Sequence, residues 1–162
     1  MQVNLNIQYE HLNSIQDLDI DDQDLLKAAI KATAFSQAKY SKFKVGAAAK
    51  LDNEAIVIGF NIENVSHSVT VCAEIALLSN IIINHSQHKI VTLALGYNNL
   101  KGHSKTPISP CGHCRQALIE YEQQSSNKIR CILGSLDGEI IIINGISNLL
   151  PLAFSNAMFN NA

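Results

Sequence analysis

Residues 43–60 read FKVGAAAKLDNEAIVIGF, and this stretch carries the pattern that decides the fold. From residue 43 to 51, apolar side chains alternate with lysine, glycine or alanine, which is the period of a β-strand. Residues 52–54, Asp-Asn-Glu, are typical of a turn, and a second apolar run occupies residues 55–60. The stretch therefore predicts a β-hairpin.

Outside the hairpin, the spacing of apolar residues predicts three helices. Asp21 and Asp22 are candidate caps for the first helix, which we expect to continue to about Tyr40. The second helix should occupy residues 72–84 and the third about 111–124. Each of these two later helices begins at a cysteine.

Three further strands complete the predicted sheet. Residues 90–95 are mostly apolar, as expected of a central strand that is covered on both faces. Residues 129–133 and 139–143 are joined through residues 135–138, a link too short for a parallel crossover, so they should form an antiparallel hairpin. The fold class is therefore α/β, with three layers, α/β/α, and a mixed five-stranded sheet.

Length and charge limit the kind of protein this is. The 162 residues correspond to one domain, predicted over residues 21–162, with residues 1–20 as a polar leader capable of adding an edge element. The net charge is −2 and no basic cluster is present, which argues against a nucleic-acid partner. With no signal-peptide pattern and no apolar run of spanning length, we expect a soluble, cytoplasmic protein with no membrane partner.

The chain has four cysteines, and three of them lie at predicted helix starts. In a reducing cytosol, cysteines indicate metal or redox chemistry rather than a disulfide framework. Cys111 and Cys114 would lie one helical turn apart, with Cys72 at the start of another helix, where the helix dipole favours thiolates. Three thiolates suit zinc and leave a fourth position for water, which is the pattern of a catalytic site.

Two other interpretations of the cysteines stay open. Cys111 and Cys114 could form a redox pair, although they lie on the third helix rather than on the first helix of a thioredoxin-like unit. A closed structural zinc site could recruit His113, His67 or Cys131 as a fourth ligand. We expect His113 to point away from the cysteines and Cys131 to be a core residue.

Several segments resemble the zinc-dependent cytidine deaminases. The residues CAE at 72–74, followed by PCGHC at 110–114, resemble the signature of that family. Further segments resemble its motifs in the same order: YSKFKVGAA at 40–48, GFNIEN at 59–64, SPCGHCRQ at 109–116 and LLPLAF at 149–154. The similarity spans about residues 24–155. It implies the small, three-cysteine, homo-oligomeric type, with a tetramer favoured over a dimer.

The resemblance implies a role for each residue of the cysteine motifs. Cys72, Cys111 and Cys114 would bind Zn²⁺. Glu74 would be the catalytic proton shuttle while water, activated by the metal, attacks the ring. Arg115 would help to offset the negative charge of the three thiolates.

The resemblance also implies a set of substrate contacts. Phe43 would pack on the pyrimidine. Asn61 and Glu63 would hold the ribose hydroxyl, which both donates and accepts hydrogen bonds. Ala73 would be a further contact, and Phe154 would approach the base from a neighbouring subunit.

The implied activity is hydrolytic deamination of free cytidine and 2′-deoxycytidine in pyrimidine salvage, with release of ammonia. Two positions depart from the family pattern, because His67 replaces a tyrosine and Ile75 replaces an arginine. These departures keep open a deaminase of another cytosine-like nucleoside, such as blasticidin S. A nucleotide or tRNA deaminase is less favoured, because no basic cluster is present to bind phosphate. A non-catalytic structural zinc protein is disfavoured, since such a site needs no Glu74.

Overall fold

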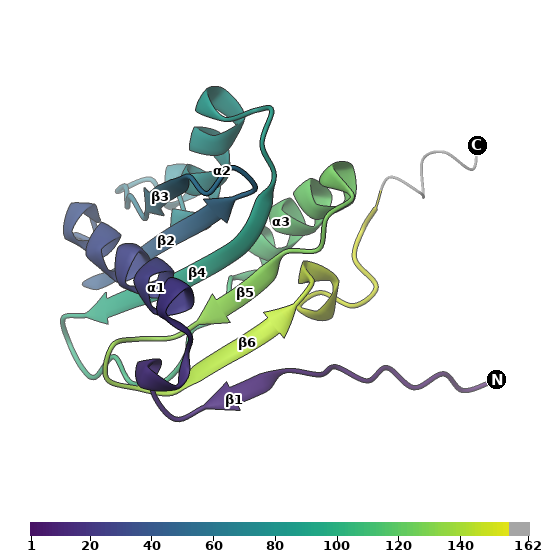
Figure 1. The fold of residues 1–162 in the computed structure, drawn as a ribbon. Coiled ribbons are helices and arrows are strands. Elements are labelled where there is room, and N and C mark those ends of the chain that lie inside the picture. Colours follow the sequence, from purple (N-terminus) through teal and green to yellow (C-terminus); the bar gives the residue numbers. More distant parts are fainter. Residues whose placement is uncertain (156–162) are drawn as a thin grey trace.

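A mixed six-stranded sheet with helices on both faces forms the body of the computed structural model, which describes residues 1–155 (Figure 1). The strand order is β1-β6-β5-β4-β2-β3, and all neighbouring strands are antiparallel except β4 and β5, which are parallel. The strands are β1 (Glu10–Leu12), β2 (Phe43–Leu51), β3 (Ile56–Phe60), β4 (Ile90–Asn99), β5 (Arg130–Leu133) and β6 (Ile140–Asn144).

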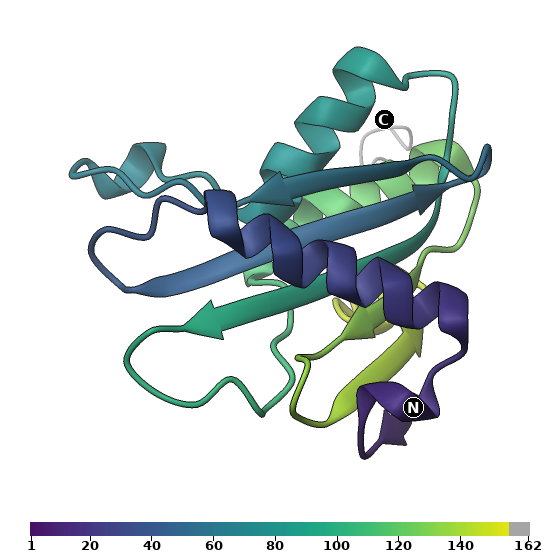
Figure 2. The ribbon, with the colours of Figure 1, turned by 60° about the vertical axis from the view of Figure 1, so that its left-hand side comes forward.

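Three helices cover the sheet, one on one face and two on the other (Figure 2). They are α1 (Ile20–Ala32) on the first face, and α2 (Ala73–Asn84) and α3 (Gly112–Ser125) on the second. Short 3₁₀ turns are η1 (Ile15–Asp17), η2 (Thr33–Phe35), η3 (His67–Val69) and η4 (Ile146–Asn148). The three-layer α/β/α arrangement is confirmed. Within residues 1–155, none of the helices has the length and apolar character needed to span a bilayer.

The sheet has one strand more than the sequence predicted. The additional strand, β1, comes from the segment expected to be a leader, and it pairs Glu10 with Ile142 at the edge of the sheet. The three paired residues are too few to show a period themselves, and the alternation that precedes them, over residues 3–9, lies outside the paired part of the strand. The chain that follows adds Ile15 and Leu18 to the core, 4% and 6% exposed.

Helix α1 begins earlier and ends earlier than predicted. Its cap is Asp19, whose side chain accepts a hydrogen bond from the N–H of Asp22, so Asp21 and Asp22 lie inside the first turn. The helix ends at Ala32 and passes into η2, rather than continuing to Tyr40. Acidic residues in the first turn of a helix are favoured by its dipole, as are acidic caps, so the sequence alone did not distinguish the two roles.

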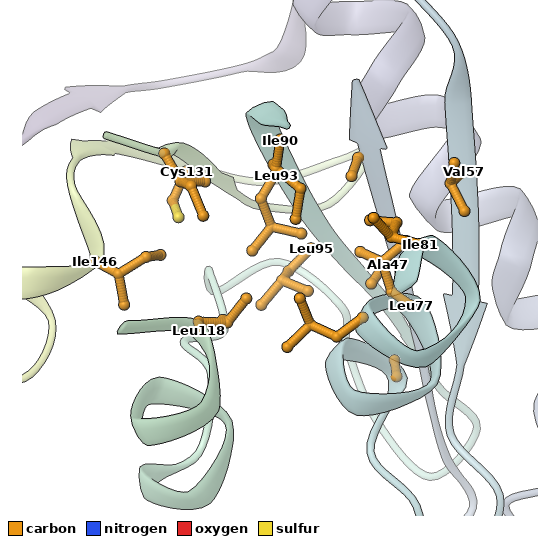
Figure 3. Packing of buried hydrophobic residues seen from close by; sticks show 14 of the residues in the cluster. Ala47, Val57, Leu77, Ile81, Ile90, Leu93, Leu95, Leu118, Cys131 and Ile146 are labelled. Carbon is orange, nitrogen blue, oxygen red and sulfur yellow. The ribbon is translucent and has the colours of Figure 1, made fainter. Parts of the chain in front are cut away.

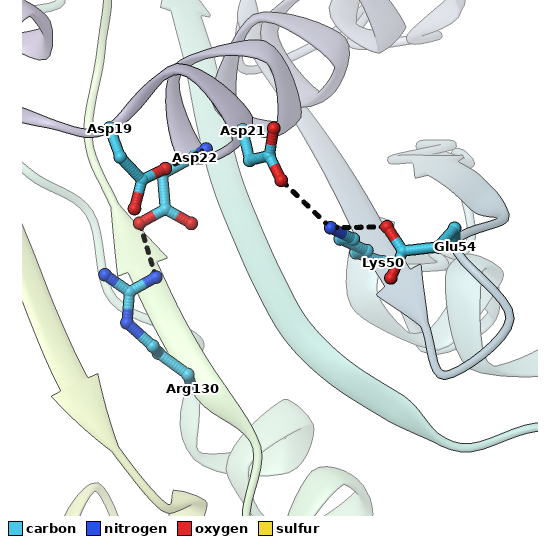
Figure 4. Close-up of polar contacts among 6 residues, drawn as sticks. All are labelled: Asp19, Asp21, Asp22, Lys50, Glu54 and Arg130. Atoms are coloured by element: carbon cyan, nitrogen blue, oxygen red, sulfur yellow. Dashed lines mark hydrogen bonds and ion pairs between the residues drawn. The ribbon is translucent and has the colours of Figure 1, made fainter.

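The two acidic residues in this first turn tie α1 to the sheet (Figure 4). Asp22 forms an ion pair of 2.5 Å with Arg130 on β5. Asp21 forms one of 3.2 Å with Lys50 on β2, and Lys50 also contacts Glu54 at 2.6 Å. The pair between Asp22 and Arg130 is the better shielded from water, since the Asp22 side chain is only 10% exposed.

The larger part of the core lies between the sheet and helices α2 and α3 (Figure 3). Leu77 of α2 and Leu118 of α3 are fully buried against β4, where Leu93 and Leu95 point to the same side. Cys131 is part of this core and is fully buried, as expected. This packing fixes the positions of α2 and α3, whose first residues carry the other three cysteines.

Glu122 is a buried carboxylate that links α3 to two other parts of the chain. Its Oε2 accepts hydrogen bonds from the N–H of Ile129 at 2.8 Å and of Ile146 at 2.9 Å, and Oε1 accepts one from Ser147 at 3.4 Å. The residue is 8% exposed. It thus satisfies backbone groups just before β5 and at η4, which the sheet leaves without partners.

We expect Glu122→Ala to lower the free energy of unfolding by about 3–5 kcal/mol, because a buried N–H without an acceptor costs roughly 1–3 kcal/mol. Gln123→Ala, at an exposed position on the same helix, is the matched control and should change stability by less than about 0.5 kcal/mol. Urea denaturation followed by circular dichroism measures both. Equal stability of the two variants would show that the hydrogen bonds of Glu122 do not contribute this much to the free energy of unfolding.

Candidate active site

The first residues of α2 and α3 face each other, and this brings three cysteines together. Cys72 is the N-cap of α2 and Cys111 the N-cap of α3, and neither side chain caps its own helix. The sulfur of Cys72 lies 4.0 Å from that of Cys111, which lies 3.5 Å from that of Cys114. Since α2 and α3 lie on the same face of the sheet, residues 39 positions apart in the sequence form one cluster.

Close packing at Gly59 sets the position of the α2 start. A Cβ atom at Gly59 of β3 would lie 2.4 Å from the carbonyl oxygen of Ala73 and 2.5 Å from the backbone nitrogen of Leu77. Only glycine permits this approach of helix to strand. The motif residue Ala73 is itself fully buried at this contact.

The spacing of the three sulfurs fits a single zinc ion. Tetrahedral zinc with Zn–S bonds of about 2.3 Å separates its sulfur ligands by about 3.8 Å. The measured separations of 3.5 and 4.0 Å bracket that value, and all three sulfurs lie within 4.8 Å of one another. Three soft thiolate donors form a set that zinc prefers. Cys72, Cys111 and Cys114 are thus suited to hold zinc with one position left open.

The other interpretations of the cysteines gain no support from the structure. All four cysteines are free thiols, and the sulfurs of Cys111 and Cys114 are well beyond the disulfide bond length of about 2.05 Å. Within residues 1–155, the metal-ligating cluster contains the three cysteines alone. The proposed fourth ligands are not members of it: His113 and His67 are exposed, and Cys131 is in the core.

The thiols of Cys72 and Cys114 share a proton before a metal binds. Hydrogen bonding from Cys114 lowers the pKa of Cys72 to about 6, although burial and the charge of Glu74 act in the opposite direction. The same hydrogen bond raises the pKa of Cys114, because its proton is held between two sulfurs. Zinc requires the thiolate form, so binding of the ion displaces that proton.

Glu74 lies in the first turn of α2, beside the sulfurs. It is 5% exposed, and burial raises the pKa of its carboxyl group above the usual value of 4.5. Hydrogen bonds from its own backbone N–H and from Cys114 act against that rise. A carboxyl group whose pKa is moved toward neutrality is suited to accept and then return a proton.

A cavity of about 400 Å³ opens beside the cysteine cluster and Glu74. It is of a size that suits a small ligand such as a nucleoside. Apart from the zinc ligands and Arg115, the sequence predicted six site residues. Five of them line this cavity, and the sixth, Phe154, does not. The lining residues are Phe43, Val45, Asn61, Glu63, Thr70, Val71, Cys72, Ala73, Glu74, Ile108, Ser109 and Cys111.

Phe43 forms an aromatic wall of this cavity and is supported from behind. Its ring stacks on that of Tyr97 with centroids 5.0 Å apart and an interplanar angle of 22°. Tyr97 is 5% exposed, and its hydroxyl donates to the carbonyl of Thr106 at 2.7 Å. The sequence did not single out Tyr97, although it directly follows the apolar run and Gly96. Its effect is to fix the plane of the Phe43 ring.

Asn61 holds the start of β2 in place as well as lining the cavity. Its Oδ1 accepts hydrogen bonds from the N–H of Val45 at 2.9 Å and from the Ser36 hydroxyl. Its Nδ2 donates to the carbonyl of Phe43 at 3.0 Å. The Val45 contact fixes which end of the amide is oxygen, so one N–H of Nδ2 is left to bind a ligand.

Glu63 is tied to the turn that precedes β2. It accepts hydrogen bonds from the N–H of Tyr40 at 2.7 Å, from the N–H of Ser41 at 3.2 Å and from the Ser41 hydroxyl. Burial opposes ionisation, but these hydrogen bonds outweigh it and lower the pKa of Glu63. The exposed His67 contributes in the same direction, and its ring lies 6.4 Å from that of Tyr40. Glu63 is therefore an ionised acceptor at the cavity wall.

Arg115 and Phe154 lie where the C-terminal segment meets α3. Arg115 donates to the carbonyls of Pro110 at 2.7 Å and Leu149 at 3.0 Å, so it holds the residue just before Cys111. The Phe154 carbonyl accepts a hydrogen bond from Gln116 at 2.8 Å, whereas its side chain is 58% exposed. Phe154 is not among the described residues that line the cavity of its own chain.

Proteins of known function share this sequence pattern. Residues 19–127 match a family model described as the cytidine and deoxycytidylate deaminase zinc-binding region. The cytidine deaminase of Halalkalibacterium halodurans is 34% identical over 142 residues, which are 88% of this chain and 100% of that protein. A cytidine deaminase of Mycobacterium tuberculosis is 41% identical over 103 residues, 64% of this chain and 73% of that one.

Solved structures share the fold as well. The cytidine deaminase of Burkholderia pseudomallei superposes with a TM-score of 0.69 at 30% identity, covering 81% of this chain and 97% of that one. The cytidine deaminase of Mycobacterium leprae gives a TM-score of 0.63 at 30% identity, covering 82% and 99%. The likeness therefore extends over almost the whole length of these proteins.

Proposed function

Because the chain belongs to the cytidine and deoxycytidylate deaminase family, we propose that it is a hydrolase that converts free cytidine and 2′-deoxycytidine to uridine and 2′-deoxyuridine, releasing ammonia. The observation that carries this proposal is the buried Glu74 beside three convergent sulfurs, at one wall of a nucleoside-sized cavity. Such a reaction belongs to pyrimidine salvage, since it acts on free nucleosides.

Cys72, Cys111 and Cys114 would hold the zinc ion of this family. When bound, the ion supplies Lewis acidity that activates a water molecule for attack on C4 of the cytosine ring. The exposed Cys111 and half-buried Cys72 line the cavity, whereas the buried Cys114 does not. The open side of the cluster is therefore directed at the place where a substrate would lie.

Glu74 would carry the protons of the reaction. It takes one proton from the attacking water and delivers it to N3 of the ring, and it then helps to protonate the exocyclic amine that leaves as ammonia. The raised pKa of its carboxyl group supports this double role, because the group must be both a base and an acid in one turnover.

Four other residues would hold the nucleoside. Phe43 would pack on the pyrimidine ring with its plane set by Tyr97, and Ala73 lines the cavity beside Glu74. The remaining N–H of Asn61 and the ionised carboxylate of Glu63 are a donor and an acceptor suited to a sugar hydroxyl. Arg115 would act indirectly, by holding the backbone before Cys111 and placing its charge near the start of α3.

We expect Glu63→Gln to raise KM for cytidine about 10- to 100-fold with little change in kcat, because a hydrogen bond to a charged group contributes roughly 1.5–3 kcal/mol. The amide keeps the shape of the side chain and can still accept from Ser41. With 2′,3′-dideoxycytidine, which lacks the sugar hydroxyls, wild type and variant should have the same KM. A KM penalty that persists with this analogue would contradict a contact to the hydroxyls.

The charge of the cavity favours nucleosides over nucleotides. None of its lining residues is lysine or arginine, and Glu63 supplies a negative charge at the sugar end. A phosphate group would meet repulsion there, and none of the described lining residues is a lysine or arginine that could offset it. We therefore expect cytidine 5′-monophosphate to be a much poorer substrate than cytidine.

The test is a panel of substrates with the zinc-loaded protein, followed by loss of ultraviolet absorbance. The panel consists of cytidine, 2′-deoxycytidine, cytosine, cytidine 5′-monophosphate and blasticidin S, and Glu74→Gln serves as the blank. Turnover of the two free nucleosides well above the others supports the proposal. Turnover of blasticidin S alone would move the assignment to that nucleoside. If no member of the panel is turned over, the protein binds zinc without this activity, and the proposal is wrong.

We also propose a homo-oligomer in the cytoplasm, with a tetramer favoured over a dimer. The exposed side chain of Phe154 lies outside the cavity of its own chain, as expected if it closes a neighbouring one. Three reduced cysteines at the site need a compartment that keeps thiols reduced. Light scattering on the purified protein measures the number of subunits.

A further inference from the structure

The first nine residues form an arm that runs away from the body of the molecule (Figure 1). Its sequence, MQVNLNIQY, alternates between polar and apolar residues and contains no charged side chain, proline or glycine. The apolar side chains of the arm are exposed: Val3 by 71%, Leu5 by 62%, Ile7 by 47% and Tyr9 by 60%. This is the period of a β-strand that has one apolar face and nothing covering it.

The arm continues β1 but has separated from the sheet. The pairing of β1 with β6 reaches only to Glu10, opposite Ile142, although β6 itself continues to Asn144. A hollow of about 500 Å³ lies beside this point, lined by residues of the arm and of β6. Within residues 1–155, no other strand pairs with the arm. Its N–H and C=O groups are thus available to another strand along both edges.

Exposed strands usually carry features that prevent pairing between molecules. Lysines, prolines, bulges or inward-pointing charges are the common ones, and residues 1–9 have no charged side chain and no proline. The arm also lies outside residues 19–127, the part of the chain that matches the deaminase family. Neither the fold nor the catalytic site accounts for it.

We propose that the arms of two copies of this chain pair as antiparallel strands across a two-fold axis centred on Asn6. Residues directly opposite each other then have numbers that sum to twelve. Val3 faces Tyr9 of the second copy and Leu5 faces its Ile7, so all four apolar side chains of each arm lie on one face of the ribbon and are paired. The sheets of the two copies become continuous through their β1 strands.

The opposite face of the ribbon is self-complementary too. Asn4 faces Gln8 of the second copy, and Asn6 faces its own counterpart. A side-chain amide is both donor and acceptor, so identical or similar amides can hydrogen-bond to each other across a strand pair. A two-fold pairing of this kind closes on itself and does not extend into a filament.

Other partners fit the arm less well. It has no lysine or arginine with which to bind an anionic lipid surface. It has no charged side chain that could select a charged peptide, whereas two such arms meet without repulsion between their side chains. The inference is independent of the catalytic proposal, because it uses none of the site residues.

Cysteine cross-linking tests the register. With Asn6→Cys, the two introduced thiols lie opposite each other, at a Cα separation of about 4.5–5.5 Å that a disulfide can span. Asn4→Cys is the matched control, because its thiol lies opposite Gln8 and not opposite itself. Both variants are studied as full-length, zinc-loaded protein at about 1 μM with a mild oxidant. Paired arms have effective concentrations of order millimolar, so the Asn6→Cys dimer should exceed that of Asn4→Cys and wild type at least about tenfold.

A charge introduced on one face of the ribbon or the other then distinguishes cross-linking of paired arms from cross-linking by chance collision. In the Asn6→Cys background, Leu5→Asp should abolish the cross-link, because it places a charge in the apolar face. Asn4→Asp, on the polar face, should leave most of it. Equal cross-linking by Asn6→Cys and Asn4→Cys, or no effect of Leu5→Asp, would overturn the proposal. Deamination and melting temperature of the same samples report on the site and the fold separately.

Discussion

Replacing Glu74 by glutamine should reduce kcat for cytidine by at least about 10²–10⁴-fold, while the protein keeps its fold and its zinc. A general acid–base group typically contributes a factor of that size, and Glu74 would act at more than one proton transfer in each turnover. Glutamine matches the size of the buried side chain, so the packing at the start of α2 should be preserved. Steady-state rates give the effect.

Two further measurements on the same samples decide what the loss means. Metal analysis should give one zinc per chain for both proteins, and their melting temperatures should agree within a few degrees. A variant that has lost its zinc would show that Glu74 supports the metal site rather than the chemistry. Activity within a few-fold of wild type would remove Glu74 from the proposed mechanism.

Replacing Cys114 by serine should remove both the zinc and the activity. Two thiolates remain in the cluster, and a buried hydroxyl is a poor ligand for zinc beside them. After dialysis we expect less than about one zinc per ten chains and no deamination above background. The melting temperature should fall toward that of the metal-free wild type, because the holoprotein loses the stabilisation that comes from binding the ion.

Cys131→Ala is the matched control for this experiment. Cys131 is also buried, but it lies in the core on β5, away from the cluster. That variant should lose some stability from the smaller side chain and yet bind one zinc per chain. Full zinc content in Cys114→Ser, or loss of zinc in Cys131→Ala, would contradict the assignment of the ligands.

The sequence predicted those parts of the fold that a local pattern determines. The alternation over residues 43–51 gave β2 with the bounds that the structure shows, and both cysteine motifs proved to be helix starts. The boundaries of α1 were wrong because three neighbouring aspartates all suit a helix start. The strand β1 depends on pairing with β6, which a segment of three residues cannot signal alone.

The residues of the catalytic cluster could be predicted from the sequence, but the residues that hold the cavity side chains in place could not. Cys72, Glu74 and Cys111 stand in motifs, so spacing and residue type point to them. Tyr97 and Ser36 come from distant segments, and they matter because the fold places them against Phe43 and Asn61. Such contacts are long-range in the sequence, and their side chains have no unusual chemistry that would single them out.

The placement of the cysteines on two helices also bears on the order of events when the chain folds. Between α2 and α3 the chain runs through β4, which pairs with β2 on one side and with β5 on the other. In the native fold the two helix starts that carry the sulfurs are positioned by a sheet that this central strand must join, so we expect the complete zinc site to form late in folding. We expect the ion to slow unfolding and to leave the refolding rate nearly unchanged, as for contacts that form after the transition state. In a cell short of zinc, this protein would then be folded but free of metal.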